Sequence, residues 1–404
     1  MTAKKILMLI PNLDFGGAQR SFCNLANALS EDHAVTIAVF NTIEGVSFEY
    51  HCKIIDLDIP GGRFFFSKAY YFLKRWHAVK SIKNKLGIDT TISYLEGANY
   101  INALTGTDRK VLSVRGSKSY DENIRGPLGW IRKNLLIPLV YKRSSHIVAL
   151  NNGIKRELEL EYGIAPKKVM VIRNFYDASK IRQLAQMPFC EELQFLKGAS
   201  YLIYAGRLAS GKGLKSILEV FAMLKQKHHG LKLVLVGDGP MKPELVRFAQ
   251  VSGFTVFVQE VSDNLRIARS DVLFLGYKDN PYQLIRWAEM LIIASTSEGG
   301  PNILMEALIC GTLVVSTDCP YGPGEQLAPE LNGKQVATAQ EVNHGILLPL
   351  LDETNPDPQL NQWSDIISEY LTKKNKRDKV IERALEWTET QSPENVLNKW
   401  RRVI

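Results

Sequence analysis

The feature that most constrains this chain of 404 residues is a regular alternation of short hydrophobic runs with longer amphipathic segments. Continuous runs rich in valine, isoleucine and leucine are typical of strands buried on both faces, as in parallel sheets covered by helices. The runs are KILMLI, AVTIAVF, TTISYL, KVLSV, HIVAL and VMVI in the first half, then YLIYAG, LKLVLVG, VLFLGY, MLIIAS and TLVVST. This alternation predicts an α/β fold rather than an all-α or all-β one.

The alternation pauses over residues 174–200, which contain no strand-like run, and then resumes with a similar rhythm. We therefore expect two α/β domains, residues 1–185 and residues 186–385. Ligands commonly bind between domains, so a cleft between the two is the expected ligand site. The last segment, residues 386–404, is expected to form a helix that can cross back to the first half.

Positive charge is concentrated in the first half of the chain. Residues 1–185 hold 27 Lys and Arg against 16 Asp and Glu, a balance of +11, whereas the whole chain carries +8. An anionic partner would therefore bind to the first half. Because no nucleic-acid recognition motif accompanies this charge, we expect no nucleic acid partner.

Residues 63–85 combine seven basic residues with seven aromatic ones and contain no acidic residue. Such a helix can lie in an anionic lipid interface, where Lys74, Arg75, Lys80 and Lys83 would meet the membrane surface. The alternative is a half-buried domain helix with a solvated basic face. Residues 129–143 have a similar character.

Other sequence features bear on the cellular compartment. The chain has no apolar run of 18 residues and no cleavage site near its start, and its five cysteines show no metal-ligand spacing. We expect a cytoplasmic protein that can associate peripherally with the inner face of the cell membrane.

Glycine-rich loops follow two of the predicted strands and precede helices. Gly16 and Gly17 lie in PNLDFGGAQR, and Arg207 and Lys212 lie in YAGRLASGKG. A helix N-terminus with nearby glycines and cations can hold a phosphate, although such turns are also common without a ligand. A third loop, GDGP, lacks the last glycine of a dinucleotide fingerprint, so we interpret it as a helix-entry turn.

The stretch STSEGGPNILMEALICG places Glu298 in a loop and Glu306 inside the following helix, eight residues later. Together with the earlier loops and FLGYKDNPYQLI, this E-x7-E pair resembles the donor-site signature of the family 4 retaining glycosyltransferases. The motifs occur in that family's order from about residue 5 to residue 327. The resemblance implies the GT-B fold, in which two Rossmann-like domains face each other across a cleft.

The resemblance also implies roles for particular residues. Arg207 and Lys212 would neutralise the departing diphosphate of a nucleotide sugar, and the Glu306 carboxylate would accept hydrogen bonds from the ribose hydroxyls. Glu298 would face the sugar hydroxyls. The other donor-binding positions would be Gly16, Gly17, Asn302, Ile303 and Leu304 at the phosphates, Gly299 and Gly300 at the sugar, and Leu275 and Tyr277 near the base.

Departures from the family pattern affect the acceptor side. The loop after KVLSV reads VRGSKS where many relatives have a histidine, so Arg115 fills the nearest position and is assigned with Glu96 to the acceptor. Gly324 stands where some relatives have arginine.

The pair Asp56 and Asp58 matches the metal motif of another glycosyltransferase fold, but it follows an early strand, and we interpret it as a solvated strand end. We expect no metal and no cofactor besides the donor substrate.

The expected function is that of a retaining glycosyltransferase. It would move a hexose or N-acetylhexosamine from a UDP-sugar to a lipid-linked or polysaccharide acceptor in bacterial-type surface glycan assembly. One alternative is a soluble glycosyltransferase with a small acceptor. Another is a non-catalytic GT-B protein that binds nucleotide sugar or glycan, against which the joint presence of Arg207, Lys212, Glu298 and Glu306 argues.

Overall fold

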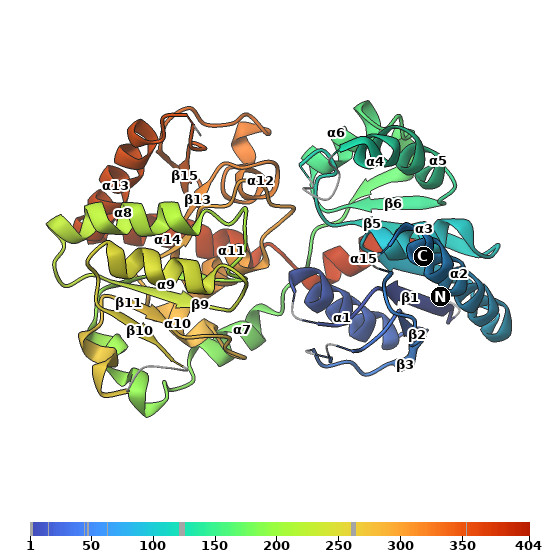
Figure 1. Ribbon diagram of the computed structural model, residues 1–404, viewed down its shortest axis with the longest axis horizontal. Coiled ribbons are helices and arrows are strands. Elements are labelled where there is room, and N and C mark those ends of the chain that lie inside the picture. Colours follow the sequence, from blue (N-terminus) through green and yellow to red (C-terminus); the bar gives the residue numbers. More distant parts are fainter. Residues whose placement is uncertain are drawn as a thin grey trace. The chain divides into compact units, whose positions relative to one another are not determined.

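A computed structural model describes residues 3–14, 16–43, 45–46, 48–62, 64–120, 126–259, 264–352 and 354–404. The chain forms two compact units, Met1–Phe175 with Ser392–Ile404, and Tyr176–Gln391. Each unit is a largely parallel sheet with helices on both faces (Figure 1). The unit boundary falls earlier than the expected one after residue 185, because helix α7 (Ala178–Ala185) packs against α10 (Tyr282–Trp287) and α11 (Asn302–Cys310).

The described strands of the first unit form one parallel sheet in the order β3-β2-β1-β4-β5-β6-β7. All six hydrophobic runs of the first half are confirmed as strands. The sequence analysis missed β3, because an edge strand is only half-buried and lacks a continuous hydrophobic run. The strands are β1 (Lys5–Ile10), β2 (Ala34–Val39), β3 (Lys53–Asp56), β4 (Thr90–Tyr94), β5 (Arg109–Val114), β6 (His146–Ala149) and β7 (Val169–Val171).

Alternate side chains of the central strand β1 supply the cores on the two faces of this sheet. Ile6, Met8 and Ile10 pack with helices α1 (Gly17–Ser30) and α15 (Pro393–Val403). Leu7 and Leu9 pack on the opposite face with α2 (Phe65–Leu86) and α3 (Glu96–Leu104). The remaining helical segments are α4 (Gly126–Ile131), a π-helical turn Arg132–Leu136, α5 (Ile137–Tyr141) and α6 (Asn152–Leu160).

The C-terminal helix α15 is part of the first unit, although the chain reaches it from the second. Its Trp400 is buried and stacks 6.4 Å from the ring of Tyr94. The Arg401 guanidinium pairs with Asp32 at 2.7 Å, and Lys4 Nζ donates to a main-chain oxygen of Ile404 at 2.9 Å. In Figure 1 this red helix lies against strands coloured blue.

The described strands of the second unit form a sheet in the order β10-β11-β9-β8-β12-β13-β15-β14, parallel except for the β14–β15 pair. The five hydrophobic runs of this half are also strands. Three further short strands were missed, because β10 is an edge strand and β14 and β15 form a hairpin with little hydrophobic length. The strands are β8 (Tyr201–Ala205), β9 (Lys232–Val236), β10 (Val256–Val258), β11 (Val272–Phe274), β12 (Met290–Ile293), β13 (Leu313–Thr317), β14 (Gln340–Val342) and β15 (Gly345–Leu348).

The second sheet is also covered on both faces. Tyr201, Ile203 and Ala205 of β8 pack with α7, α10 and α11, whereas Leu202 and Tyr204 belong to the core under the other helices. No helix among the described residues is both long enough and apolar enough to cross a membrane. The other helices are α8 (Leu214–Lys227), α9 (Lys242–Val251), α12 (Gly322–Leu327), α13 (Asp357–Thr372) and α14 (Lys374–Glu389).

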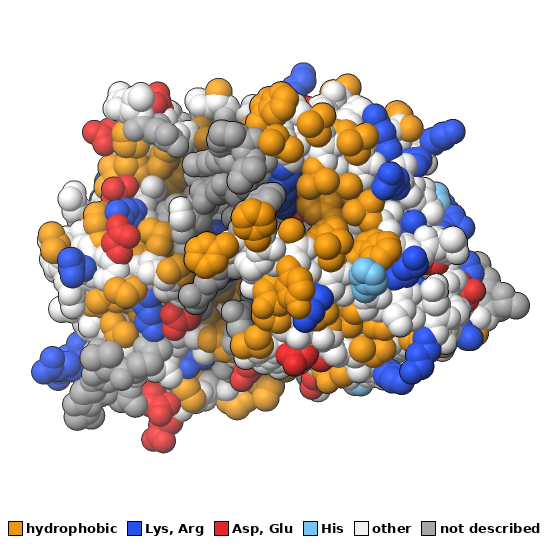
Figure 2. Space-filling view, turned by 45° about the vertical axis from the view of Figure 1, so that its right-hand side comes forward, with side chains coloured by type: hydrophobic (Ala, Val, Ile, Leu, Met, Phe, Trp, Pro, Cys, Tyr) orange, Lys and Arg blue, Asp and Glu red, His pale blue; other side chains and the backbone are white. Residues whose placement is uncertain are grey.

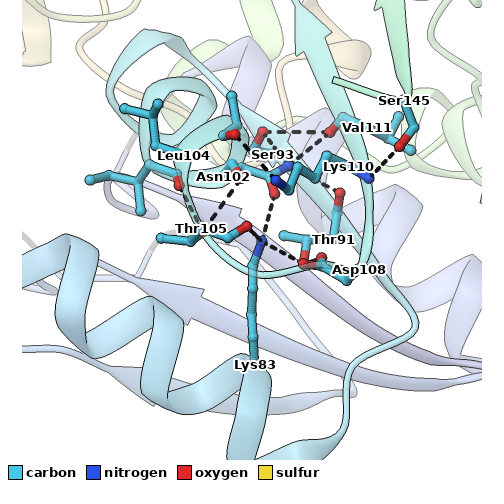
Figure 3. A network of polar contacts seen from close by, with 12 residues as sticks. Lys83, Thr91, Ser93, Asn102, Leu104, Thr105, Asp108, Lys110, Val111 and Ser145 are labelled. Atoms are coloured by element: carbon cyan, nitrogen blue, oxygen red, sulfur yellow. Dashed lines mark hydrogen bonds and ion pairs between the residues drawn. The ribbon is translucent and has the colours of Figure 1, made fainter. Parts of the chain in front are cut away.

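A buried polar network fixes helix α2 to the first sheet (Figure 3). Lys83 Nζ donates to Asn102 Oδ1 at 2.9 Å and to the Thr105 carbonyl at 3.2 Å, and it pairs with Asp108 at 3.1 Å. Thr91 Oγ1 donates to the second oxygen of Asp108. The Lys83 and Asp108 side chains are 2% and 3% exposed. Burial lowers the pKa of Lys83 to about 8, even though Asp108 acts in the opposite direction.

Replacing Lys83 tests this network. Lys83→Ala leaves the Asp108 carboxylate buried without its countercharge, so we expect a loss of about 3–5 kcal/mol in the free energy of unfolding. Lys80→Ala, on the exposed side of the same helix, should change it by less than about 0.5 kcal/mol. Urea unfolding followed by circular dichroism measures both. Equal midpoints for the two variants would show that the ion pair does not hold the helix.

Candidate functional site

The glycine-rich loop that follows β8 packs directly on the loop that follows β12. These two strands are parallel neighbours, so both loops lie at the carboxyl edge of the sheet. The Thr296 amide donates to the Gly211 carbonyl at 2.9 Å. Gly213 has a φ of +62°, and a Cβ atom there would lie 2.0 Å from the Ala294 carbonyl oxygen. Only glycine permits this approach of two backbones.

A third loop, which contains GDGP, packs on the other side of the same glycine-rich segment. The Leu208 amide donates to the Asp238 carbonyl at 2.8 Å, and the Met241 amide donates to the Leu208 carbonyl at 3.0 Å. Gly237 has a φ of +128°, and a Cβ atom there would lie 1.9 Å from the Gly206 carbonyl oxygen. The GDGP glycines therefore serve backbone packing ahead of helix α9, in agreement with a helix-entry turn.

This packing brings together two of the predicted catalytic residues. Lys212 Nζ pairs with Glu298 Oε1 at 2.6 Å, and Ser295 Oγ donates to the same oxygen at 2.7 Å. The Lys212 side chain is 31% exposed and that of Glu298 is 15% exposed. The pair is therefore accessible from solvent and yet fixed by neighbours on one side.

The backbone on either side of Glu298 is held by the loop that leads into α12. The Glu298 amide donates to the Pro320 carbonyl, and the Glu298 carbonyl accepts from the amides of Tyr321 and Gly322, all at 2.9–3.0 Å. A Cβ atom on Gly322 would lie 2.8 Å from the Cα of Gly300. The backbone that carries the Glu298 side chain is thus held by main-chain contacts from a segment more than twenty residues later.

Helix α11 begins directly after this loop. Its first residues are Asn302, Ile303 and Leu304, and no side chain of the residue before them caps the helix. Amides in a first helical turn have no partner within the helix and can bind an anion. Glu306 lies one turn further along and is 2% exposed. The side-chain oxygen of Asn302 accepts a hydrogen bond from the Tyr176 hydroxyl at 3.0 Å.

Arg207 and the predicted base-binding residues lie at the same edge of the sheet. The Arg207 side chain is exposed. The main-chain carbonyl of Arg207 accepts a hydrogen bond from the Tyr204 hydroxyl at 2.9 Å. Burial, and next the charge of Glu298, raises the pKa of that hydroxyl, so Tyr204 stays a neutral donor. Leu275 is buried just after β11, whereas Tyr277 is 47% exposed.

Four of the predicted residues belong to the first unit. Gly16 and Gly17 mark the start of helix α1, which has no side-chain cap. Arg115 follows β5, and its guanidinium donates to Ser21 Oγ at 2.8 Å and to the side-chain oxygen of Asn174. The same guanidinium lies 4.6 Å from the centre of the Tyr94 ring.

Glu96 is the fourth, and it begins helix α3 within a cluster of polar groups. Lys118 Nζ pairs with it at 2.9 Å, and the Tyr141 hydroxyl donates to it. Burial by itself raises the pKa of the Glu96 carboxyl. The charge of Lys118 and the hydrogen bonds from Tyr141 and Tyr100 lower the pKa by a larger amount, so the net shift is downward. Glu96 is therefore an ionised group at neutral pH.

The structure places the predicted residues in two sets. One set lies at the carboxyl edge of the second sheet and contains Arg207, Lys212, Glu298 and the other predicted donor-binding residues of that unit. The other set belongs to the first unit and consists of Gly16, Gly17, Glu96 and Arg115. Sequence reasoning missed Ser295, Tyr204, Lys118 and Tyr141. Ser295 was detectable by its place three residues before Glu298, but a tyrosine inside a hydrophobic run is indistinguishable from a core residue.

In the part of the chain that the structure describes, no three or more His, Cys, Asp or Glu residues are grouped so that they could hold a metal ion. Asp56 is exposed at the end of β3, where its carboxylate accepts the Thr42 amide at 3.1 Å and the Asp58 amide at 2.8 Å.

Two family models match the chain, one in each half. Residues 15–180 match the model described as Glycosyltransferase Family 4, and residues 190–387 match Glycosyl transferases group 1. A solved structure of HepE from Anabaena, in complex with UDP, superimposes with a TM-score of 0.71 at 15% identity and covers 98% of both chains. The fold is thus the GT-B fold, and the matches support a GT-B glycosyltransferase.

Two curated relatives share about a quarter of their aligned residues with this chain. A Campylobacter jejuni enzyme named N-acetylgalactosamine-N,N'-diacetylbacillosaminyl-diphospho-undecaprenol 4-alpha-N-acetylgalactosaminyltransferase is 26% identical over 84% of this chain and 87% of its own length. An uncharacterized glycosyltransferase of Methanocaldococcus jannaschii is also 26% identical, over 65% of this chain and 64% of that protein.

The close loop packing around Lys212 can be tested at Gly213. Gly213→Ala combines an unfavourable positive φ with a backbone clash, so we expect it to lower the free energy of unfolding by more than about 2 kcal/mol. Gly230→Ala is the matched control, since an added Cβ there meets nothing within 4 Å, and its effect should stay below about 0.5 kcal/mol. Thermal and urea unfolding report both. A tolerated Gly213→Ala would mean that the loops do not need this backbone contact.

Proposed function

We propose that this protein is a retaining glycosyltransferase that moves a hexose or N-acetylhexosamine from a UDP-sugar to a lipid-linked or polysaccharide acceptor. The setting would be bacterial-type surface glycan assembly. The observation that carries the proposal is the Lys212–Glu298 pair, held between a glycine-rich loop and the first turn of helix α11. A cation, a carboxylate and the first turn of a helix meet there at one sheet edge.

The leaving diphosphate would bind among these cations and amides. Cleavage of the bond between the sugar C1 and the diphosphate oxygen leaves negative charge on UDP, while C1 bonds to the acceptor oxygen and the acceptor hydroxyl gives its proton to the departing diphosphate oxygen. Lys212 and the exposed Arg207 would stabilise that negative charge. The first turn of α11, with the amides of Asn302, Ile303 and Leu304, adds the positive end of a helix dipole. Gly16 and Gly17 would contribute amides from the start of α1.

The other donor contacts follow from the chemistry of the side chains. Glu306 would accept from the ribose hydroxyls, which suits an ionised carboxylate facing a vicinal diol. Glu298, Gly299 and Gly300 would contact the sugar, and Leu275 and Tyr277 would lie near the base. Retention of configuration and the choice of UDP are parts of this proposal, which the E-x7-E resemblance and the UDP bound by HepE support.

The acceptor side is assigned to the first unit. Glu96 would accept hydrogen bonds from an acceptor sugar, and Arg115 would lie near its charged group, although both are also held by protein partners. A lipid-linked acceptor is supported by the undecaprenol diphosphate in the name of the Campylobacter jejuni relative. A small acceptor or a non-catalytic binding protein remains the alternative, and slow UDP release from UDP-sugar without acceptor separates an enzyme from a binder.

Removing either cation tests the donor site. Arg207→Ala and Lys212→Ala should each lower turnover by more than about tenfold, because each removes positive charge from the leaving diphosphate. Lys215→Ala, three residues later and paired with Glu244 on the surface, is the matched control and should keep full activity. Release of UDP is the assay, and circular dichroism verifies folding. Normal turnover in both site variants would refute the proposed role.

We further propose that turnover needs no divalent metal and no cofactor. The two cations and the helix N-terminus can supply the countercharge that a metal ion supplies in other transferases. Activity should therefore persist in EDTA, measured as UDP release with and without added Mn²⁺ or Mg²⁺. Loss of activity in EDTA, followed by recovery with either ion, would contradict this.

A further inference from the structure

Exposed hydrophobic side chains are concentrated in two segments of the first unit. Of the 17 large hydrophobic side chains that the described residues expose, nine lie in residues 64–73 and 130–139. Among these nine, the most exposed are Phe66 at 85%, Phe64 at 78% and Leu139 at 65%. We call this set the apolar surface. Its members are Phe64, Phe66, Tyr70 and Leu73 at the start of α2, and Trp130, Ile131, Leu135, Leu136 and Leu139 along α4 to α5.

The two segments share a neighbour in the folded unit. Helices α2 and α5 both pack against α3, and α2 and α3 cover the face of the first sheet opposite α1 and α15. Figure 2 shows hydrophobic side chains gathered over this unit, with Lys and Arg side chains around them. Contiguous apolar areas of this kind mark interaction sites more often than chance exposure.

The apolar surface is not needed to attach these helices to the core. Helix α2 is fixed by the buried Val79, by Lys83, and by Trp76, whose indole N–H donates to the Leu104 carbonyl at 2.9 Å. Helix α5 is fixed by the buried Ile137 and Tyr141. The exposed side chains thus point away from contacts that already hold both helices in place.

The two segments themselves carry charge of a single sign, although Glu161 of a neighbouring loop pairs with Lys133 at 3.0 Å. Residues 64–86 and 126–143 contain no Asp or Glu. Their exposed cations are Lys68, Lys74, Lys80, Lys85, Lys142 and Arg143. Lys74 and Lys80 lie over the aromatic rings of Tyr70 and Trp76, with Nζ 4.8 and 4.9 Å from the ring centres.

The structure corrects the set of basic residues expected to meet a membrane. Lys83 is buried against Asp108. The Arg75 guanidinium donates to the Ile59 carbonyl at 2.9 Å and lies 4.3 Å from the Phe40 ring. These two cations hold the fold, because their side chains point inward from the helix, and Lys74 and Lys80 are the outward ones. Residue 63 lies outside the described residues.

We propose that the apolar surface and its exposed lysines dock this protein on an anionic lipid bilayer. Aromatic and aliphatic side chains would enter the interface between headgroups and acyl chains, and the lysines would pair with lipid phosphates. A second copy of this chain fits poorly, since a symmetric interface would bring two mainly positive surfaces together. The proposal rests on the proposed function, to which it adds the place where a lipid-linked acceptor is met.

Vesicle sedimentation tests the apolar part. The protein should sediment with vesicles of phosphatidylglycerol and phosphatidylcholine, and rising salt should release it because the lysine–phosphate attraction is screened. Phe66→Ser/Leu139→Ser should weaken binding by about tenfold or more. Leu160→Ser/Val251→Ser is the matched control, because both side chains are 83% exposed outside the apolar surface, and it should bind like the wild type.

A second pair of variants tests the charge. Lys74→Ser/Lys80→Ser should weaken binding by about tenfold and reduce its dependence on salt. Lys53→Ser/Lys167→Ser removes two exposed lysines of the same unit outside both segments and should not weaken it. Neither pair touches the donor site, so UDP release from UDP-sugar in the absence of lipid should be unchanged in all variants.

The outcomes separate the docking surface from the proposed function. The docking proposal would be overturned if Phe66→Ser/Leu139→Ser and Lys74→Ser/Lys80→Ser bound vesicles like the wild type. It would also be overturned if the wild type bound purely phosphatidylcholine vesicles as strongly as anionic ones. Neither result would affect the proposed transferase activity. Self-association that Phe66→Ser/Leu139→Ser abolishes would also overturn it, in favour of a second copy. Lipid binding without any UDP release would uphold the surface and refute the transferase.

Discussion

The donor half of the candidate site depends on close backbone contact between loops at the carboxyl edge of the second sheet. Gly213 meets the Ala294 carbonyl and Gly237 meets the Gly206 carbonyl at distances that exclude any Cβ atom. This contact brings Lys212 within 2.6 Å of Glu298, although 86 positions separate them in the chain. Because each loop leaves a buried parallel strand, its start is fixed by the sheet, and the backbone contacts alone bring the two charged side chains together.

Helix α2 carries a buried ion pair on one side and exposed hydrophobic residues on the other. Its inner side carries Lys83 into a buried network with Asp108, where an unpaired charge would be costly. Its outer side exposes Phe66 and Leu73 among lysines. The inner contacts hold the helix without help from the exposed hydrophobic side chains, which is what the proposed docking surface requires of this helix.

Much of the fold could be predicted because buried parallel strands need continuous hydrophobic runs. Every run named in the sequence analysis is a strand. The missed strands β3, β10 and β14 lie at sheet edges and are partly exposed, whereas β15 is buried but only four residues long. The site was predictable to the extent that its residues lie in loops with glycine and charge. Tyr204 and Tyr141 were not, because a hydrophobic run does not reveal that a tyrosine hydroxyl will face Arg207 or Glu96.

The sequence by itself determined the α/β class, the two-part organisation and the loops that hold Arg207, Lys212 and Glu298, since hydrophobic periodicity and glycine-rich turns are local properties. Only the tertiary structure decided which cations are available. Four basic residues of one helix look equivalent in the sequence, yet Lys83 and Arg75 are held by Asp108 and by the Ile59 carbonyl, whereas Lys74 and Lys80 reach solvent. The partners that make this distinction come from other strands and loops, and the direction of a side chain depends on what packs around its helix rather than on the residues beside it in the chain.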